Sequence, residues 1–249
     1  MSGHAFLVGI GIFLSRIAGL VRERVFAHFF GNSAAGDAFK AALKIPNFLQ
    51  NLFGEGVLSA SFIPVYASLL AKKHDEEAAK VASVIGRLMF LMTSVLVIGG
   101  VFATPFLIEI IAPGFTGEKR ELTIKIVQIL FPGTGFLVMS AWCLGILNSH
   151  KKFFLSYVAP VIWNLTIIAT LAMWGHKQEQ FDLAITVSWG LVAGSFLQFF
   201  VQLPSALRLG KKIWPSLDIK VSSVTTILRN FVPVVVSRGV VQVLSLIHI

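Results

Sequence analysis

A line of polar and charged side chains runs along one side of the second hydrophobic stretch of this sequence. At about 100° per helical residue, its members fall within roughly 80° of arc if the helix is continuous. Ionisable residues are expensive inside a bilayer and are usually kept where a polar cavity or pathway needs them. The sequence therefore predicts a polar cavity beside this stripe, which consists of Asp37, Lys40, Lys44, Asn47, Asn51 and Glu55.

The first hydrophobic stretch also carries charged residues at membrane depth. On a helical wheel Arg22 falls close to Ser15. Arg16 and Glu23 lie within about 100° of Ser15, and Arg24 points to the opposite side. Arg16 and Glu23 are spaced to form an ion pair. Arg22 and Arg24 are close enough to the interface to snorkel, which is the simpler explanation for Arg24. Arg16 lies near mid-span, where snorkelling is harder, so we expect it to face a cavity.

Small residues and a proline predict where these two stretches bend or approach a neighbour. Pro46 breaks the helical hydrogen-bond ladder, and Gly54 and Gly56 lower the cost of bending beside Glu55. A broken helix lining a cavity, as in transporters, and a static kink both fit these residues. In the first stretch, a spacing of four predicts the close approach of another helix at Gly11, Ser15 and Gly19.

The two stretches together hold five cations and three anions, an excess that suits an anionic solute. Arginine binds phosphate in a bidentate manner, so the solute is expected to carry phosphate. A second Ser-Arg pair, Ser237-Arg238, stands in the last hydrophobic stretch as Ser15-Arg16 stands in the first. This similarity hints at an internal repeat of six helices.

The composition decides what kind of elements position these residues. The 249 residues are 55% hydrophobic and 13% charged and include 22 Phe, whereas soluble domains carry about 25% charged residues. A span needs about 20 apolar residues with every backbone amide bonded within the segment, which predicts helices and not barrel strands. Four stretches without Asp, Glu, Lys or Arg are long enough: Leu88–Ile108, Ile126–Ser149, Phe153–Gly175 and Leu183–Leu207.

We predict an all-α polytopic membrane bundle with seven segments, near 5–30, 35–70, 81–111, 122–148, 153–174, 183–206 and 224–249. Nine Lys and Arg fall in the links on one side and three on the other, which places the N-terminus and the nine-cation side in the cytoplasm. The net charge of +9 then reflects topology, not nucleic-acid binding. Residues 1–206 would form a six-helix lobe, 207–223 a cytoplasmic linker and 224–249 the start of a second lobe, so the chain is expected to be the N-terminal portion of a larger transporter.

No catalytic, metal or cofactor motif is predicted. The six histidines show no metal-ligand spacing, and the single cysteine, Cys143, lies in an apolar run where packing explains it. The sequence has no Gly-x-Ser-x-Gly, P-loop or His-Glu-x-x-His motif. It also lacks the Asp-rich motif that a membrane enzyme acting on polyprenyl phosphate would need.

Several motifs resemble the MurJ (MviN) family of lipid II flippases, within the MATE-like exporter superfamily. The resemblance covers nearly the whole chain and is most specific in the first sixty-odd residues. Farther along, the family's fourth-to-fifth helix turn is matched by Ile146-Leu147-Asn148 with Phe153, Ala159-Pro160 and Asn164. Many members carry a basic pair where this chain has Gln50-Asn51. The motifs are Ser15-Arg16-x-x-Gly19-x-x-Arg22-Glu23, Asp37-Ala38-Phe39, Lys44-Ile45-Pro46-Asn47-Phe48-Leu49, Phe53-Gly54-Glu55-Gly56 and Ser59-x-x-Phe62-Ile63-Pro64.

The resemblance implies two six-helix lobes around a central cationic cavity, and translocation of undecaprenyl-pyrophosphate-linked peptidoglycan precursor across the inner membrane by alternating access. By resemblance, Arg16 and Arg22 attract the pyrophosphate or the sugar-peptide head group, Asp37 holds a gate, and Glu55 serves a similar pairing role. The implied partners are lipid II, membrane lipids and cell-wall synthesis proteins. The substrate-binding candidates are Arg16, Arg22, Lys44, Asn47 and Arg238; the gating or ion-pair candidates are Glu23, Asp37 and Glu55.

Three other interpretations fit parts of the sequence. A sibling exporter of the same superfamily would move drugs or other oligosaccharide lipids and would bind a cationic drug in preference to lipid II. An integral membrane enzyme acting on polyprenyl phosphate would show Mg²⁺-dependent turnover. A transport-inactive fragment or scaffold, assembled with cell-wall synthesis proteins, would do neither.

Overall fold

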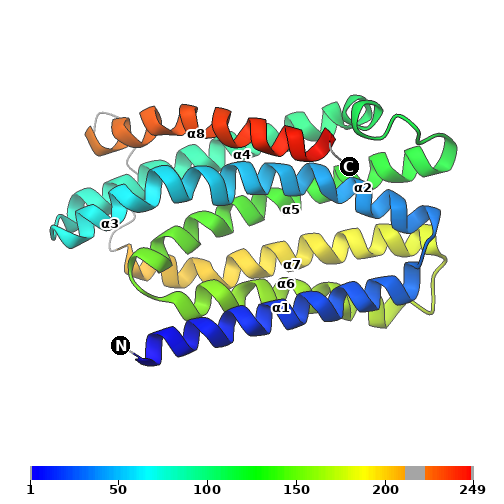
Figure 1. Ribbon diagram of the computed structural model, residues 1–249, viewed down its shortest axis with the longest axis horizontal. Helices are drawn as coiled ribbons and strands as arrows, with labels where there is room; N and C mark the ends of the chain where they lie inside the picture. Colours follow the sequence, from blue (N-terminus) through cyan, green and yellow to red (C-terminus); the bar gives the residue numbers. More distant parts are fainter. Residues whose placement is uncertain (1, 211–221, 248–249) are drawn as a thin grey trace.

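The computed structural model describes residues 2–210 and 222–247, and these residues form an elongated bundle of helices (Figure 1). Each predicted segment coincides with one helix, or with α2, η1 and α3 together, so the predicted all-α membrane bundle is confirmed. The elements are α1 (Ser2–Phe30), α2 (Ala34–Leu49), the π-helix η1 (Gln50–Phe62), α3 (Ile63–Ala71), α4 (Asp75–Ile111), α5 (Gly117–Ser149), α6 (Phe153–Trp174), α7 (Gln180–Leu209) and α8 (Ser222–Ile247).

Four of the described helices, α4 to α7, are long and apolar enough to cross a membrane. Their outer faces carry large apolar side chains that a soluble protein would bury, such as Phe102, which is 81% exposed, and Val95, which is 70% exposed. Hydrocarbon is the solvent that such a surface requires. Helix α1 is also long, with 29 residues, but it carries Arg16, Arg22, Glu23 and Arg24.

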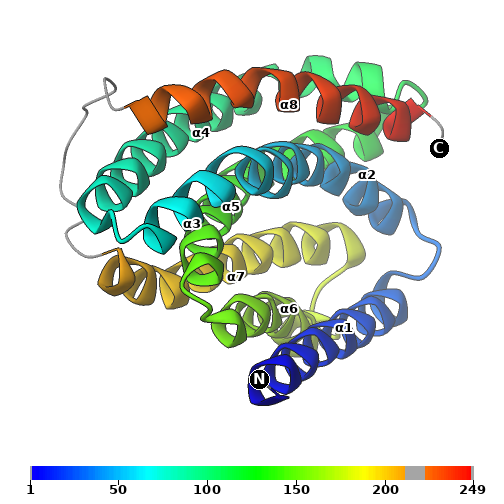
Figure 2. The same ribbon diagram turned by 60° about the vertical axis from the view of Figure 1, so that its left-hand side comes forward.

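Helix α5 is the central element of the bundle, because it packs against α7, α4 and α2. Helix α1 packs mainly against α6, although a short turn joins it to α2 (Figure 2). The apolar core consists of two clusters, one around Phe30 and Leu130 and the other around Phe62 and Ile146.

The second predicted segment is one continuous helical path that changes its hydrogen bonding. The α-helical part runs through the buried Pro46 to Leu49, and the backbone then forms a π-helix over Gln50–Phe62. A proline cannot donate its backbone hydrogen bond, and Gly54 and Gly56 lower the cost of an unusual backbone in the following turns. Where the sequence predicted a bend, the backbone forms the wider turns of a π-helix. Such turns are frequently found at functional sites.

The predicted linker begins inside α7, which extends to Leu209, and most of it (211–221) lies outside the described residues. Helix α8 packs against η1 and α4. Its assignment to a second lobe stays a prediction, as does the boundary of the first lobe at residue 206.

Candidate functional site

A cavity of about 430 Å³ lies between α1, η1, α5, α6 and α7. Ile63, the first residue of α3, also belongs to its lining. Its polar and small lining residues come from all five elements: Ser15, Gly19, Arg22, Gln50, Ser59, Ser140, Asn164 and Gln198. From the second stretch the described lining includes Gln50 and Ser59 but no residue of the predicted stripe, so a cavity beside that stripe stays a prediction.

Arg22 is the charged residue of this cavity, and α6 holds it in place. Its guanidinium lies 4.9 Å from the centroid of the Trp163 ring, a cation–π contact that contributes about 0.5–2 kcal/mol. The indole Nε1 of Trp163 donates to Ser195 Oγ on α7 at 3.1 Å, which fixes the plane of the ring. The neighbouring Glu23 carboxylate accepts a hydrogen bond from Arg22 but is itself 64% exposed, so this pair is weak.

Arg22 also lines a second, smaller cavity of about 60 Å³ between α1, α2, α6 and α7. Glu23 and Lys40 share this lining, and Lys40 Nζ lies 6.0 Å from the Phe26 ring. The structure thus brings Arg22, Glu23 and Lys40 together, and Arg22 separates the two cavities.

The other predicted residues are more dispersed. Arg16 is exposed on α1, Lys44 is half-buried and Asn47 is exposed on α2. Glu55 belongs to η1 and Arg238 to α8, but their side chains lie outside the described residues. None of these roles is tested by the structure, and they stay predictions.

Asp37 forms an ion pair with a residue of another helix. Its Oδ2 pairs with Lys119 Nζ on α5 at 3.0 Å, and not with Lys40 or Lys44 on its own helix. Lys119 also lies 4.0 Å above the Phe115 ring. The reason is tertiary: the first turns of α2 and α5 meet at the same end of the bundle, where Lys119 is held by the ring and by Asp37.

Sequence reasoning missed a buried polar network on the wall of the large cavity. Gln198 Nε2 donates to Ser140 Oγ at 3.1 Å, and Ser140 Oγ donates to Gln202 Oε1 at 3.0 Å. Asn164 is 5% exposed and donates from Nδ2 to the Pro160 carbonyl at 3.0 Å. Amides inside otherwise apolar spans were the signal, since such residues usually face the interior of a bundle.

Asn164 Oδ1 adds an acceptor to this wall. It is buried without a hydrogen-bond partner in the described part of the chain, although buried polar atoms are usually paired. Together with the guanidinium of Arg22, it gives the cavity one cation and one free acceptor. Among the described residues, no three His, Cys, Asp or Glu side chains gather closely enough to hold a metal ion.

The predicted small-residue face of α1 has two different roles. A Cβ added at Gly11 would stand 2.8 Å from Tyr157 Cβ on α6, which confirms the close helix approach there. A Cβ added at Gly19 would meet nothing within 4 Å among the described residues. Gly19 instead lines the cavity, so the small side opens into the polar space.

Comparison with known proteins places this fold in a family. The profile described as "Lipid II flippase MurJ" matches residues 26–249. A probable lipid II flippase MurJ of Buchnera aphidicola subsp. Schizaphis graminum is 31% identical over 229 residues, which is 91% of this chain and 44% of the relative. The lipid II flippase MurJ of Burkholderia cenocepacia is 29% identical over 240 residues, 94% of this chain and 46% of the relative. The chain therefore spans less than half the length of these relatives.

Solved structures agree with the sequence comparison. The structure titled "Lipid II flippase MurJ, inward closed conformation" matches with a TM-score of 0.74 and 31% identity, covering 93% of this chain and 48% of that one. An outward-facing multidrug resistance MATE transporter matches with a TM-score of 0.73 at 15% identity, over 96% of this chain and 52% of that one, which shows a shared fold alone. This multi-pass inner-membrane protein belongs to the MurJ family of lipid II flippases.

Proposed function

We propose that this chain forms the first lobe of a transporter that flips lipid II across the inner membrane by alternating access. The relatives named as lipid II flippases support the substrate, and the activity is that of the complete protein. The observation that carries the proposal is Arg22, a cation held over Trp163 at the boundary of two cavities.

The chemistry of the substrate explains why such a cavity is needed. A charged head group costs many kcal/mol to place in hydrocarbon, so flipping requires a hydrated and cationic passage. Arg22 would neutralise part of the pyrophosphate, and Asn164 Oδ1 would accept a hydrogen bond from a head-group hydroxyl or amide. At about 430 Å³ the cavity is the size of a small-molecule site, so it would hold a part of the head group.

The remaining candidates receive roles within this scheme. Arg16, Lys44, Asn47 and Arg238 would contact the head group along its path, and Glu55 would pair with one of these cations. The Asp37–Lys119 pair would belong to an outer gate, because it joins the first turns of α2 and α5, which lie at the end of the bundle opposite to the ends of α3 and α7 (Figure 1). This assignment takes the N-terminus to be cytoplasmic.

The test is substitution of Arg22 in the complete protein, with flipping of fluorescent lipid II measured in reconstituted vesicles. Arg22→Ala should slow flipping about tenfold to a hundredfold, because a charge-assisted hydrogen bond contributes about 1.5–3 kcal/mol. The flipping rate of Arg22→Lys should lie between those of the parent and of Arg22→Ala, because lysine keeps the charge but lacks the planar guanidinium. The control is Arg24→Ala on the same helix, which should stay within about twofold of the parent.

Two results would decide against the proposal. Equal losses for Arg22→Ala and Arg24→Ala would mean that general charge and not the cavity matters. Flipping of a cationic drug in place of lipid II would assign the protein to the drug exporters that share its fold.

A further inference from the structure

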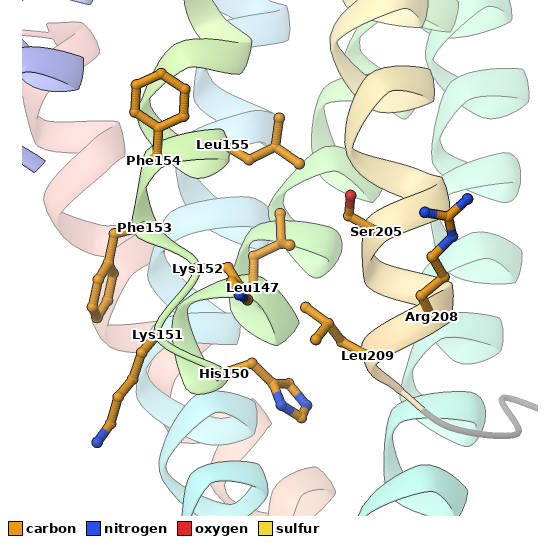
Figure 3. A pocket seen from close by; sticks show the side chains of 10 residues that line it. All are labelled: Leu147, His150, Lys151, Lys152, Phe153, Phe154, Leu155, Ser205, Arg208 and Leu209. Atoms are coloured by element: carbon orange, nitrogen blue, oxygen red, sulfur yellow. The ribbon is translucent and has the colours of Figure 1, made fainter. Parts of the chain in front are cut away.

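A second, separate pocket of about 570 Å³ lies at the end of the bundle where α5 turns into α6 and α7 ends (Figure 3). It shares no lining residue with the cavity at Arg22. Its rim carries Lys151 and Lys152 from the α5–α6 turn and Arg208 from α7, and its walls include Leu147 and Phe154. Lys151 and Arg208 extend outward from opposite walls (Figure 3). The pocket is thus apolar inside and cationic at its rim.

The charges at this rim are not balanced within its own lining, because the described residues that form it include no Asp or Glu. The ion pairs of the described residues do not involve Lys151, Lys152 or Arg208. The adjoining cavity of about 400 Å³, which shares Lys151 and Arg208, adds Asp75. Three cations and one nearby carboxylate leave the region positive.

The start of α6 strengthens the positive potential of the pocket. The helix has 22 residues and begins at Phe153 with no side-chain cap and no acidic residue in its first turn. Its first N–H groups therefore have no capping side chain and favour an anion. Helix α4 begins at the same end of the bundle with Asp75, Glu76 and Glu77 in its first turn, so its N-terminus is already neutralised.

An apolar stripe on α7 leads to the same rim. Leu197 is 41% exposed and Val201 is 39% exposed, and their spacing places them on the face of α7 that ends at Arg208. Phe154, at the pocket itself, is 47% exposed. A cation at the end of an exposed apolar stripe matches a molecule with an anionic head and a hydrocarbon tail.

We propose that this pocket binds an anionic phospholipid of the leaflet at this end of the bundle. The phosphate contacts Lys151, Lys152 and Arg208 at the rim, and an acyl chain lies along Leu197 and Val201. Charge complementarity and the continuous apolar path favour a phospholipid over a free phosphate ion, which would gain nothing from the apolar walls.

The experiment measures phospholipid retention by the complete protein in detergent, using native mass spectrometry with added phosphatidylglycerol or phosphatidylcholine. The triple variant Lys151→Gln, Lys152→Gln and Arg208→Gln should reduce phosphatidylglycerol binding more than tenfold, at about fivefold for each charge removed near an anionic head group. The matched control removes three other cations at the same end, Lys72→Gln, Lys73→Gln and Lys80→Gln, and should change binding less than threefold. Phosphatidylcholine should bind more weakly to the parent.

Several outcomes would overturn the proposal. Equal losses in the two triple variants would show a diffuse attraction to the basic end, and equal binding of phosphatidylcholine would show that charge plays no part. Displacement of phosphatidylglycerol by millimolar inorganic phosphate would reveal a site for the free ion. If the triple variant fails to fold, Arg208→Gln alone should reduce binding about fivefold, and an unchanged affinity in that variant also refutes the site.

Discussion

Gly19 offers a way to block the large cavity without disturbing the packing of the bundle. A Cβ at this position would meet no atom of the described residues within 4 Å, whereas at Gly11 on the same helix it would stand 2.8 Å from Tyr157 Cβ. We therefore expect Gly19→Phe to fill polar space and to stop lipid II flipping while the protein stays folded. Gly11→Ala should instead push α1 away from α6.

Gly19→Ala and Gly11→Ala are expected to change the free energy of unfolding in opposite directions. Replacing glycine by alanine in a helix gains about 1 kcal/mol of propensity, and Gly19→Ala adds no contact that opposes this gain. Gly19→Ala should therefore be as stable as the parent or up to about 1 kcal/mol more stable. Gly11→Ala inserts a methyl group against Tyr157, and overpacking of this kind costs about 1–3 kcal/mol.

Two measurements on the complete protein separate these effects: thermal unfolding in detergent, and flipping of fluorescent lipid II in vesicles. Gly19→Phe should keep the unfolding temperature of the parent and lose most of the flipping, whereas Gly11→Ala should lower the unfolding temperature. Normal flipping by a folded Gly19→Phe protein would show that the cavity is not on the substrate path. A large drop in the stability of Gly19→Ala would show that a side chain at position 19 collides with a neighbour.

Three other predictions concern different parts of the lobe. Arg16→Ala in the complete protein should abolish lipid II flipping while membrane insertion stays intact, and normal growth of a strain that relies on this variant would contradict the role. Reversing one charge of the Asp37–Lys119 pair, by Asp37→Lys or Lys119→Asp, should slow flipping, and combining the two should restore it; stability should change by less than about 1 kcal/mol because Asp37 is 60% exposed. Gly100→Ala would place a Cβ 2.2 Å from the ring of the buried Phe131 and should lower stability by about 1–3 kcal/mol in thermal unfolding.

The helices could be predicted from the sequence because lipid imposes strong constraints on it. Runs without charged residues must be helical when no water is available to their backbone, and the described helices follow these runs closely. The π-helix could not be predicted in this way. Pro46 indicated a disturbance, but the choice between a kink, a break and wider turns depends on packing against α5 and α8. The wheel analysis assumed α-helical turns, so it does not apply to Asn51 and Glu55 in η1.

The site was predictable in part for a similar reason. The cost of a charge at membrane depth predicted a cavity in this region, but it singled out Arg16, whereas the residue that lines the cavity is Arg22, which the family resemblance had indicated. Which neighbour contacts that charge depends on the fold. Trp163 is far from Arg22 in the sequence, but its ring contacts the Arg22 guanidinium in the structure. Asp37 shows the same limit, because its partner Lys119 comes from another helix.

The contact between Arg22 and Trp163 also gives the protein an intrinsic optical reporter. The guanidinium lies over the indole ring, and indole fluorescence responds to nearby positive charge. An anion that draws the guanidinium away would change the emission of Trp163, while the hydrogen bond to Ser195 keeps the ring in place. Occupancy of the cavity would then be readable by titration without any attached dye, once the other four tryptophans of the five are replaced by phenylalanine.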